Sequence, residues 1–228
     1  MSNIIYKCFR GSHAQGLALP TSDKDYFEIV LPPVEAVLGL DNMVGSQHIK
    51  DGVDTRFITL KEFLKEALKG RSTELEVLFA RIEHQQYISP IGQELIENRH
   101  RLISQRLFKG LLGFFDGQQK RLLKGHGKGN ADNAVGYDLK LGAHGLRAMW
   151  QAINLKKTGR LDIFVEDRDM AVTLLLIKMG EVPLNNLLIT YEHFEKMFHS
   201  LDDKLVPPNP DHNWASKFLI RTYKDAYC

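Results

Sequence analysis

Residues 11–33 read GSHAQGLALPTSDKDYFEIVLPP and join a Gly-Ser turn to two aspartates that are separated by one residue. A mostly apolar run then predicts a strand over residues 26–31, ended by Pro32 and Pro33 because proline cannot donate to a ladder. Asp23 and Asp25 lie at the mouth of that strand, where residues i and i+2 face the same way. Two like charges on one face repel each other, so the spacing indicates a bound divalent cation.

The Gly-Ser turn itself has the composition of a phosphate cradle. Gly11 allows the backbone to approach a phosphate closely, and the amides that open a following helix, with the Ser12 hydroxyl, can hydrogen-bond its oxygens. His13 lies inside the same turn. An isolated aspartate pair is most often turn chemistry, but its combination with this turn favours a catalytic site.

Size and composition are those of an ordinary soluble globular protein. The 228 residues, 43% hydrophobic and 25% charged, suffice for two modest lobes, which we favour over one large domain. A formal net charge of +2 argues against a surface that is basic all over, so any basic patch is local. Cys8 and Cys228 form no zinc or disulfide pattern, which predicts a reducing, cytoplasmic setting. No secretory leader or membrane span is expected.

The hydrophobic patterns predict an α+β fold. Residues 1–89 are expected to form a small lobe in which helices cover one face of a mixed β-sheet, and residues 90–228 a mostly α-helical lobe. Strands are predicted at residues 3–10, 26–31 and 53–60, and helices at residues 60–68, 74–79, 91–98, 102–123, 139–155, 170–179 and 191–198. A short aromatic segment at residues 214–227 ends the chain.

A third carboxylate is predicted at the start of the third strand. Asp54 joins Asp23 and Asp25 if its strand lies beside theirs. Such a set suits two-metal chemistry, in which carboxylates converge on cations about 3.5–4 Å apart. Asp51 competes for this role, but it precedes Gly52, whereas Asp54 adjoins the β-rich run.

A second cluster is basic and lies within the predicted helix at residues 139–155. Lys140, His144 and Arg147 follow one another at spacings of four and three, so they share one face of the helix. That face can grip the β and γ phosphates of a nucleotide or a nucleic-acid backbone, and Tyr137 one turn earlier can stack on a base. The alternative is the solvated face of an amphipathic helix.

Several segments carry a family resemblance. Gly11-Ser12, then Asp23-Lys24-Asp25 and a strand, resembles the DNA polymerase beta-type nucleotidyltransferase superfamily. The longer agreement, GSHAQGLALPTSDKDY followed by IVLPP, resembles more narrowly the nucleotidyltransferases found beside RNA ligases in bacteria and phages. Further segments extend it over most of the chain: LKEFLKEALKGRSTELEVLF, KLGAHGLRAMW, KKTGRLDI and IKMGEVP.

The resemblance implies a nucleotidyltransferase lobe with a helical lobe that closes over the nucleotide. Carried over by position, the turn residues Gly11 and Ser12 would hold the triphosphate. Asp23 and Asp25 would bind both metal ions, Mg²⁺ or Mn²⁺, and Asp54 would activate the acceptor hydroxyl. The resemblance also favours a role in binding phosphate or nucleic acid for the basic helix face, over a merely solvated face.

One position departs from the pattern expected for that group. Glu28 stands where a glycine or another small residue is expected, so it either crowds the site or supplements Asp54.

The function predicted from the sequence is transfer of a nucleoside monophosphate from an NTP such as ATP to a hydroxyl acceptor, with release of pyrophosphate. An RNA end or tRNA is the favoured acceptor, and a protein or a small molecule is the alternative. A silent module that binds nucleotide or RNA is the alternative from another class. The presence of all three carboxylates favours an enzyme.

Overall fold

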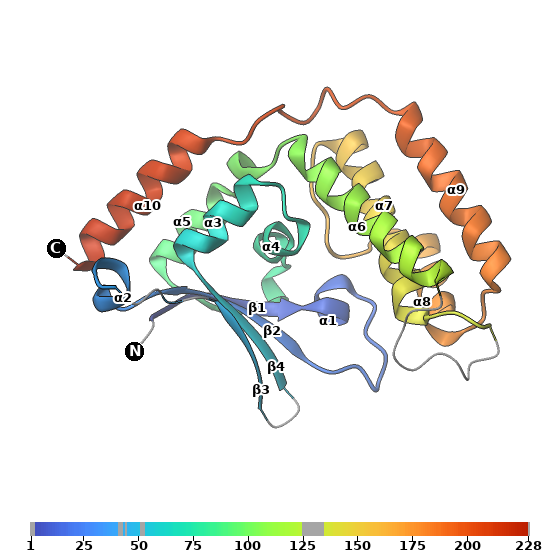
Figure 1. The fold of residues 1–228 in the computed structure, drawn as a ribbon, viewed down its shortest axis with the longest axis horizontal. Helices are drawn as coiled ribbons and strands as arrows, with labels where there is room; N and C mark the ends of the chain where they lie inside the picture. Colours follow the sequence, from blue (N-terminus) through green and yellow to red (C-terminus); the bar gives the residue numbers. More distant parts are fainter. Residues whose placement is uncertain (1–2, 41–42, 44, 51–52, 125–134, 228) are drawn as a thin grey trace. The chain divides into compact units, whose positions relative to one another are not determined.

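The structure is a computed structural model that describes residues 3–40, 43, 45–50, 53–124 and 135–227 (Figure 1). Its chain forms two compact units, of which the first comprises Met1–Ser104 together with Asn209–Cys228 and the second comprises Gln105–Pro208. These bounds differ from those of the expected lobes, because helix α5 (Pro90–Glu97) and the last helix, α10 (His212–Tyr227), fall within the first unit.

The β-sheet of the first unit is mixed, as predicted. Within the described residues it has five strands in the order β3-β4-β2-β1-β5, and β2 and β4 are parallel whereas the other neighbours are antiparallel. The strands are β1 (Asn3–Arg10), β2 (Asp25–Leu31), β3 (Ser46–Lys50), β4 (Val53–Thr59) and β5 (Gln85–Ile88).

The two strands that the sequence did not predict are the two edges of the sheet. The sequences of β3, SQHIK, and β5, QQYI, contain few apolar residues. An edge strand packs less of its surface than a central strand does, so it needs no alternating apolar pattern and gives a weak signal. The residues of the three central strands were predicted to within two positions at each end.

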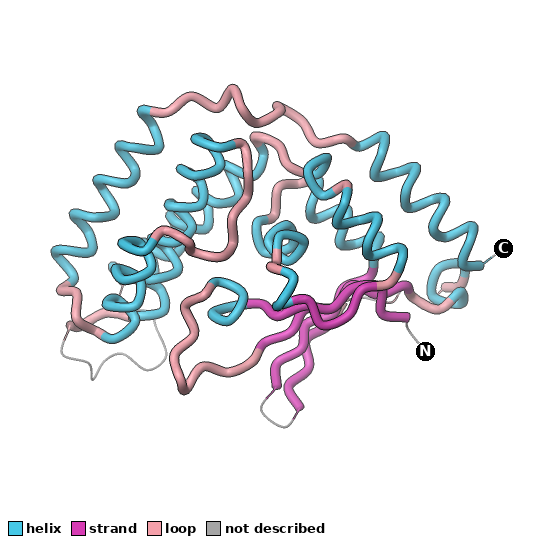
Figure 2. Tube along the Cα trace, turned by 180° about the vertical axis from the view of Figure 1, so that it is seen from behind, coloured by secondary structure: helices cyan, strands magenta, loops and turns pink. Residues whose placement is uncertain are grey.

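Helices cover one face of this sheet. Figures 1 and 2 show α3 (Leu60–Leu68), α4 (Ser72–Glu76) and α5 on the same side of the strands. The buried core between the layers includes Tyr6, Phe27, Ile29, Phe63, Leu75, Leu78 and Leu95. The Tyr6 hydroxyl donates to the Val77 carbonyl at 2.8 Å, so this buried polar group is satisfied. Short elements complete the unit: α2 (Val34–Leu38), η1 (Val77–Phe79), η2 (Ile82–His84) and η3 (Arg99–Leu102).

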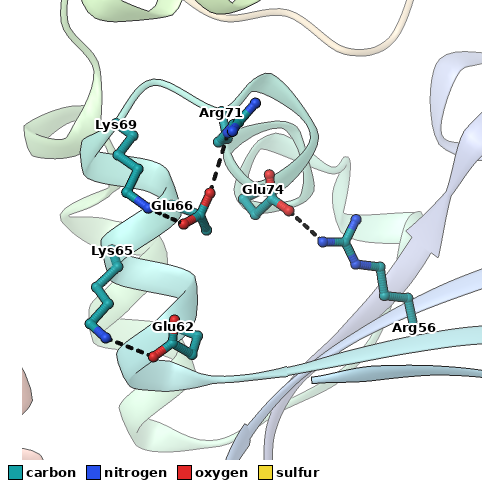
Figure 3. A network of polar contacts seen from close by, with 7 residues as sticks. All are labelled: Arg56, Glu62, Lys65, Glu66, Lys69, Arg71 and Glu74. Carbon is teal, nitrogen blue, oxygen red and sulfur yellow. Dashed lines mark hydrogen bonds and ion pairs between the residues drawn. The ribbon is translucent and has the colours of Figure 1, made fainter. Parts of the chain in front are cut away.

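An ion pair joins the strand that carries Asp54 to the helical layer. Arg56 of β4 contacts Glu74 of α4 at 2.6 Å, and the Glu74 side chain is only 5% exposed (Figure 3). A charged hydrogen bond at such depth orients both groups, because the loss of either partner leaves a buried charge. It therefore holds the middle of β4 against α4.

Helix α10 is tied to the first unit by polar contacts at both of its ends. The Asp211 amide donates to the Arg101 carbonyl at 2.8 Å, and their side chains form an ion pair at 2.9 Å. At the other end, the Tyr227 hydroxyl donates to the Pro32 carbonyl, and between the two ends Arg221 forms an ion pair with Glu94 of α5. These contacts explain why the C-terminal segment belongs to the lobe that contains the sheet.

The second unit is helical, as predicted. It contains α6 (Arg106–Leu123), α7 (Leu139–Thr158), α8 (Arg168–Met179) and α9 (Leu184–Ser200), and α7 packs against the other three. Gly145 of α7 allows α9 to approach, since a Cβ there would lie 2.3 Å from the Tyr191 hydroxyl. That hydroxyl donates to the Gly142 carbonyl at 2.6 Å. In the described part of the chain, none of the helices is long and apolar enough to cross a membrane.

Candidate active site

Asp25 and Asp54 face each other across two neighbouring strands. The parallel register of β2 and β4 pairs the Cα of Asp25 with the Cα of Asp54, near the start of each strand. Matched residues of adjacent strands project from the same face of a sheet. A shared site requires that the strand of Asp54 lies beside β2. The register shows that it does.

Asp23 is placed differently from Asp25. It is exposed in the segment that precedes β2, and because the strand begins at Asp25, the period of two does not govern the direction of its side chain. Among the residues that the structure describes, no group of three or more His, Cys, Asp and Glu side chains is gathered to hold a metal ion. The structure thus brings together Asp25 and Asp54 and leaves Asp23 outside that pair.

The carboxylate of Asp54 is held by one of its two oxygens. Oδ2 accepts from the Arg10 guanidinium at 3.3 Å and from the side-chain amide of Gln47 at 2.5 Å. Oδ1 is buried and meets no hydrogen-bond donor within the described ranges. A buried carboxylate oxygen without a donor is costly, so this atom is suited to receive a proton or a cation.

Gly11 brings the backbone against the other carboxylate. It opens helix α1 (Gly11–Gln15) directly after β1 with a φ of +63°, a conformation that strains residues with a side chain. A Cβ at this position would lie 2.9 Å from Oδ2 of Asp25. Only glycine allows this approach without strain.

Ser12 and His13 follow Gly11 in α1, and each is half-buried. Nε2 of His13 lies 3.3 Å from the Ser22 carbonyl oxygen, which links the turn to the segment that carries Asp23. The sequence-predicted turn and the aspartate segment are thus in contact.

The donor set fits a divalent cation such as Mg²⁺ or Mn²⁺. Asp25 and Asp54 supply the hard carboxylate oxygens that these ions prefer, and the buried Oδ1 of Asp54 is an acceptor that a cation would satisfy. The absent side chain at Gly11 leaves room beside Asp25.

Glu28 plays no part in this arrangement. It lies three residues beyond Asp25 in β2, so its side chain projects from the opposite face of the sheet, where it forms an ion pair with Lys7 at 2.8 Å. It therefore neither crowds the Asp25–Asp54 pair nor supplements it. Asp51, the other alternative to Asp54, lies outside the described residues.

The basic cluster predicted on α7 runs from the surface into the core of the second unit. Lys140 is exposed, His144 is partly buried and Arg147 is only 6% exposed. The Arg147 guanidinium donates to Oε1 of Gln151 at 2.8 Å. The three positions thus share one face of the helix but differ in their access to solvent.

The charges of this cluster act on its two partly buried basic side chains, His144 and Lys178. Burial, together with the positive charges of Arg147, Lys178 and Lys140, lowers the pKa of His144 to about 4, whereas the charge of Asp138 acts in the opposite direction. Burial and the charge of Lys140 also lower the pKa of Lys178, which lies on α8. Lys178 is therefore a member of the cluster that the sequence did not indicate, because it comes from a different helix.

Tyr137 is a core residue. Its side chain is 2% exposed, and its hydroxyl donates to the Val182 carbonyl at 2.8 Å. Its ring lies against Gly142, where a Cβ would come within 2.9 Å of the tyrosine Cε2. No face of the ring is open to a nucleobase, so the base-stacking role expected from its position one turn before Lys140 does not fit.

Sequence reasoning also missed Arg10 and Gln47, the two donors to Asp54. Gln47 lies on β3, an edge strand without an apolar pattern. Arg10 directly precedes Gly11, and its role depends on the antiparallel register that pairs its Cα with that of Asp25. The sequence shows a charged residue at the end of β1, but it does not show which residue that side chain contacts.

Two comparisons with known proteins bear on this site. A protein of Enterobacteria phage T4, described as an uncharacterized 38.9 kDa protein in the nrdC-mobD intergenic region, is 32% identical over 83 residues. The match covers 32% of the chain and 25% of the phage protein, so it spans a quarter of that relative. The model of RlaP, the RNA repair pathway DNA polymerase beta family, matches residues 1–218. The resemblance to polymerase beta-type nucleotidyltransferases is thereby confirmed, and the chain belongs to the RNA repair pathway DNA polymerase beta family.

Proposed function

We propose that this protein transfers a nucleoside monophosphate from an NTP to a hydroxyl at an RNA end, in a reaction that depends on Mg²⁺ or Mn²⁺ and releases pyrophosphate. The observation that carries the proposal is the register pair of Asp25 and Asp54, with the Gly11 backbone against Asp25. Membership of an RNA repair family of polymerase beta type supports both the chemistry and the choice of RNA.

Asp25 and Asp54 would hold the metal, and Asp23 would join them from the adjoining segment. When bound, such ions stabilise the charge that develops on the attacking and leaving oxygens. In the reaction, the acceptor oxygen attacks the α-phosphorus, the bond to the pyrophosphate oxygen breaks, and the carboxylate of Asp54 takes the proton of the acceptor hydroxyl.

The turn at Gly11 and Ser12, with His13, is proposed to contact the triphosphate. The steric argument at Gly11 supports this role, because a side chain there would fill the space beside Asp25.

The second unit is proposed to bind phosphate through the α7–α8 cluster of Lys140, His144, Arg147 and Lys178. The positive charges of Arg147, Lys178 and Lys140 act on His144, and the charge of Lys140 acts on Lys178, which supports a cluster of cations near enough to one another to repel. A phosphate group relieves that repulsion. Exposed Lys140 is the first contact that an anion entering the cluster would meet.

The test is a labelling experiment. The protein is incubated with each α-phosphate-labelled NTP, with Mg²⁺ or Mn²⁺, and with RNA, DNA or protein acceptors, and the labelled species is identified. Label on RNA that disappears with EDTA and in Asp25→Asn supports the proposal. Label on DNA or on protein, and not on RNA, shows a different acceptor. No label, together with NTP affinity that does not respond to Mg²⁺, indicates a silent binding module and contradicts the proposal.

A further inference from the structure

The side chain of Arg10 reaches across the carboxylate pair. In the sheet order, β1 neighbours β2 and β2 neighbours β4, so the strand of Arg10 is separated from that of Asp54 by the strand of Asp25. The register pairs Arg10 with Asp25, and Asp25 with Asp54. Yet the Arg10 guanidinium contacts Oδ2 of Asp54 at 3.3 Å. To make this contact, the Arg10 side chain extends across β2, the strand that carries Asp25.

This ion pair lies in a partly enclosed setting. The side chains of Arg10 and Asp54 are 27% and 20% exposed, so solvent screens their attraction only in part. The other donor to Oδ2, Gln47, is neutral. Arg10 therefore brings one positive charge to Asp54 from a strand on the far side of Asp25.

We propose that Arg10 takes the place of the divalent cation in the cation-free protein. Its guanidinium balances negative charge at the Asp25–Asp54 pair before a cation binds, and Arg10 opposes cation binding until its side chain leaves Asp54. This inference rests on the proposed function, in which the same two carboxylates hold the metal. Arg10 opposes a cation that arrives at Oδ1 in two ways, because like charges repel and because its contact with Oδ2 keeps Asp54 from offering both oxygens to the cation.

Two consequences distinguish this role from a purely structural one. Removal of the Arg10 charge strengthens cation binding, since the competitor is gone. The same change lowers the stability of the cation-free protein, since Asp54 then loses its positively charged partner, and a bound cation restores the loss. A structural arginine would lower stability equally with and without the cation.

The experiment measures the Kd of Mn²⁺ for the full chain without nucleotide, from the electron paramagnetic resonance signal of free Mn²⁺. We expect the Kd to fall about threefold or more in Arg10→Gln at low ionic strength, and the effect to shrink as salt is added. Arg10→Lys, which keeps the charge, stays near the wild-type value. Arg71→Gln is the matched control, because it removes the same charge from an exposed ion pair with Glu66 (Figure 3).

Melting temperatures in EDTA and in saturating Mn²⁺ provide the second measurement. Arg10→Gln should melt below the wild type in EDTA and gain more from Mn²⁺ than the wild type does. Arg10→Met offers the same comparison if the glutamine variant does not fold.

The outcomes separate the two proposals. Wild-type protein that binds Mn²⁺, with no tightening in Arg10→Gln or equal tightening in Arg71→Gln, overturns the role of Arg10 and leaves the carboxylate site standing. Wild-type protein that binds no Mn²⁺, or binds it equally well as Asp54→Asn, overturns both.

Discussion

Asp25 and Asp54 are register partners in the parallel ladder of β2 and β4, although a helix and an edge strand separate them along the chain. Their carboxylates therefore share a face through the pairing of two strands and not through a local motif. Gly11 adjoins Asp25, and Arg10 reaches Asp54, so both ends of the pair are contacted from the junction of β1 and α1. The site is thus built by three central strands of one unit.

Replacement of Asp54 by asparagine should abolish transfer while the fold persists. Asparagine keeps the size of the side chain but removes the group that accepts the proton, and a general base contributes about 100-fold or more to rate. The measurement is the single-turnover rate of labelling of RNA, with circular dichroism to confirm the fold.

Glu28→Gln is the matched control for Asp54→Asn, because Glu28 is a strand carboxylate on the other face that pairs with Lys7. We expect its labelling rate to stay near that of the wild type, with a cost of about 1 kcal/mol in unfolding free energy. A Glu28 variant that loses activity as Asp54→Asn does would contradict the assignment of the third carboxylate.

Gly11→Ala should lose both stability and Mn²⁺ binding. An L-residue at a φ of +63° is strained by about 1–2 kcal/mol, and its Cβ would in addition press on Oδ2 of Asp25. Gly136→Ala is the control for strain alone, since Gly136 has a φ of +71° and a Cβ there would meet nothing within 4 Å. Urea unfolding and Mn²⁺ titration check both variants. Equal losses in the two would show that contact with Asp25 is unimportant.

The central part of the fold could be predicted because its residues have strong local patterns. The apolar run of β2 and its double proline, and the helical period of α3, are visible without tertiary information. The edge strands β3 and β5 could not be predicted in the same way, since their pairing is made by backbone groups that any sequence possesses.

The same distinction applies to the candidate site. Gly11 and Asp25 were found from residue type and spacing. Residue type and spacing could not identify the partners of Asp54, because Arg10 and Gln47 contact it from two different strands. Tyr137 is a residue that was predicted to bind a base and lies in the core. An aromatic residue one turn before a basic helix face is compatible with either role, and its 2% exposure identifies it as a core residue.

Gly145→Ala should destabilise the second unit through its contact with Tyr191. The new methyl group would lie 2.3 Å from the tyrosine hydroxyl, so α9 must shift or the hydroxyl must leave the Gly142 carbonyl. Overpacking of this kind costs about 1–3 kcal/mol, measured as unfolding free energy in urea.

Tyr191→Phe supplies the second arm of a double-mutant cycle. Alone it removes the hydrogen bond to Gly142 and should cost about 1 kcal/mol. Combined with Gly145→Ala it should cost less than the sum of the two, because the atom in closest contact is gone. Strict additivity would show that the two residues do not interact.

The environment of His144 makes the stability of the folded protein depend on pH. The groups that act on it are Arg147, Lys178 and Lys140, which disfavour its charged form, and Asp138, which favours it. Its pKa in the fold is about 4, below the ordinary value of 6.5. Between these values the unfolded chain binds a proton at this residue and the folded chain does not, so acidification favours unfolding.

His144→Gln should therefore flatten the pH profile of unfolding. We expect the wild type to lose about 2 kcal/mol more than the variant between about pH 7.5 and about pH 5, because the variant has no proton to bind in the unfolded state. Above the ordinary pKa of histidine the difference between the two proteins should not change with pH. Tripolyphosphate added near pH 5 should reduce the wild-type loss, since an anion at the cluster offsets the charges of Lys140, Arg147 and Lys178. Parallel profiles for the two proteins would show that His144 is not electrostatically strained and would remove the support for a phosphate site at this cluster.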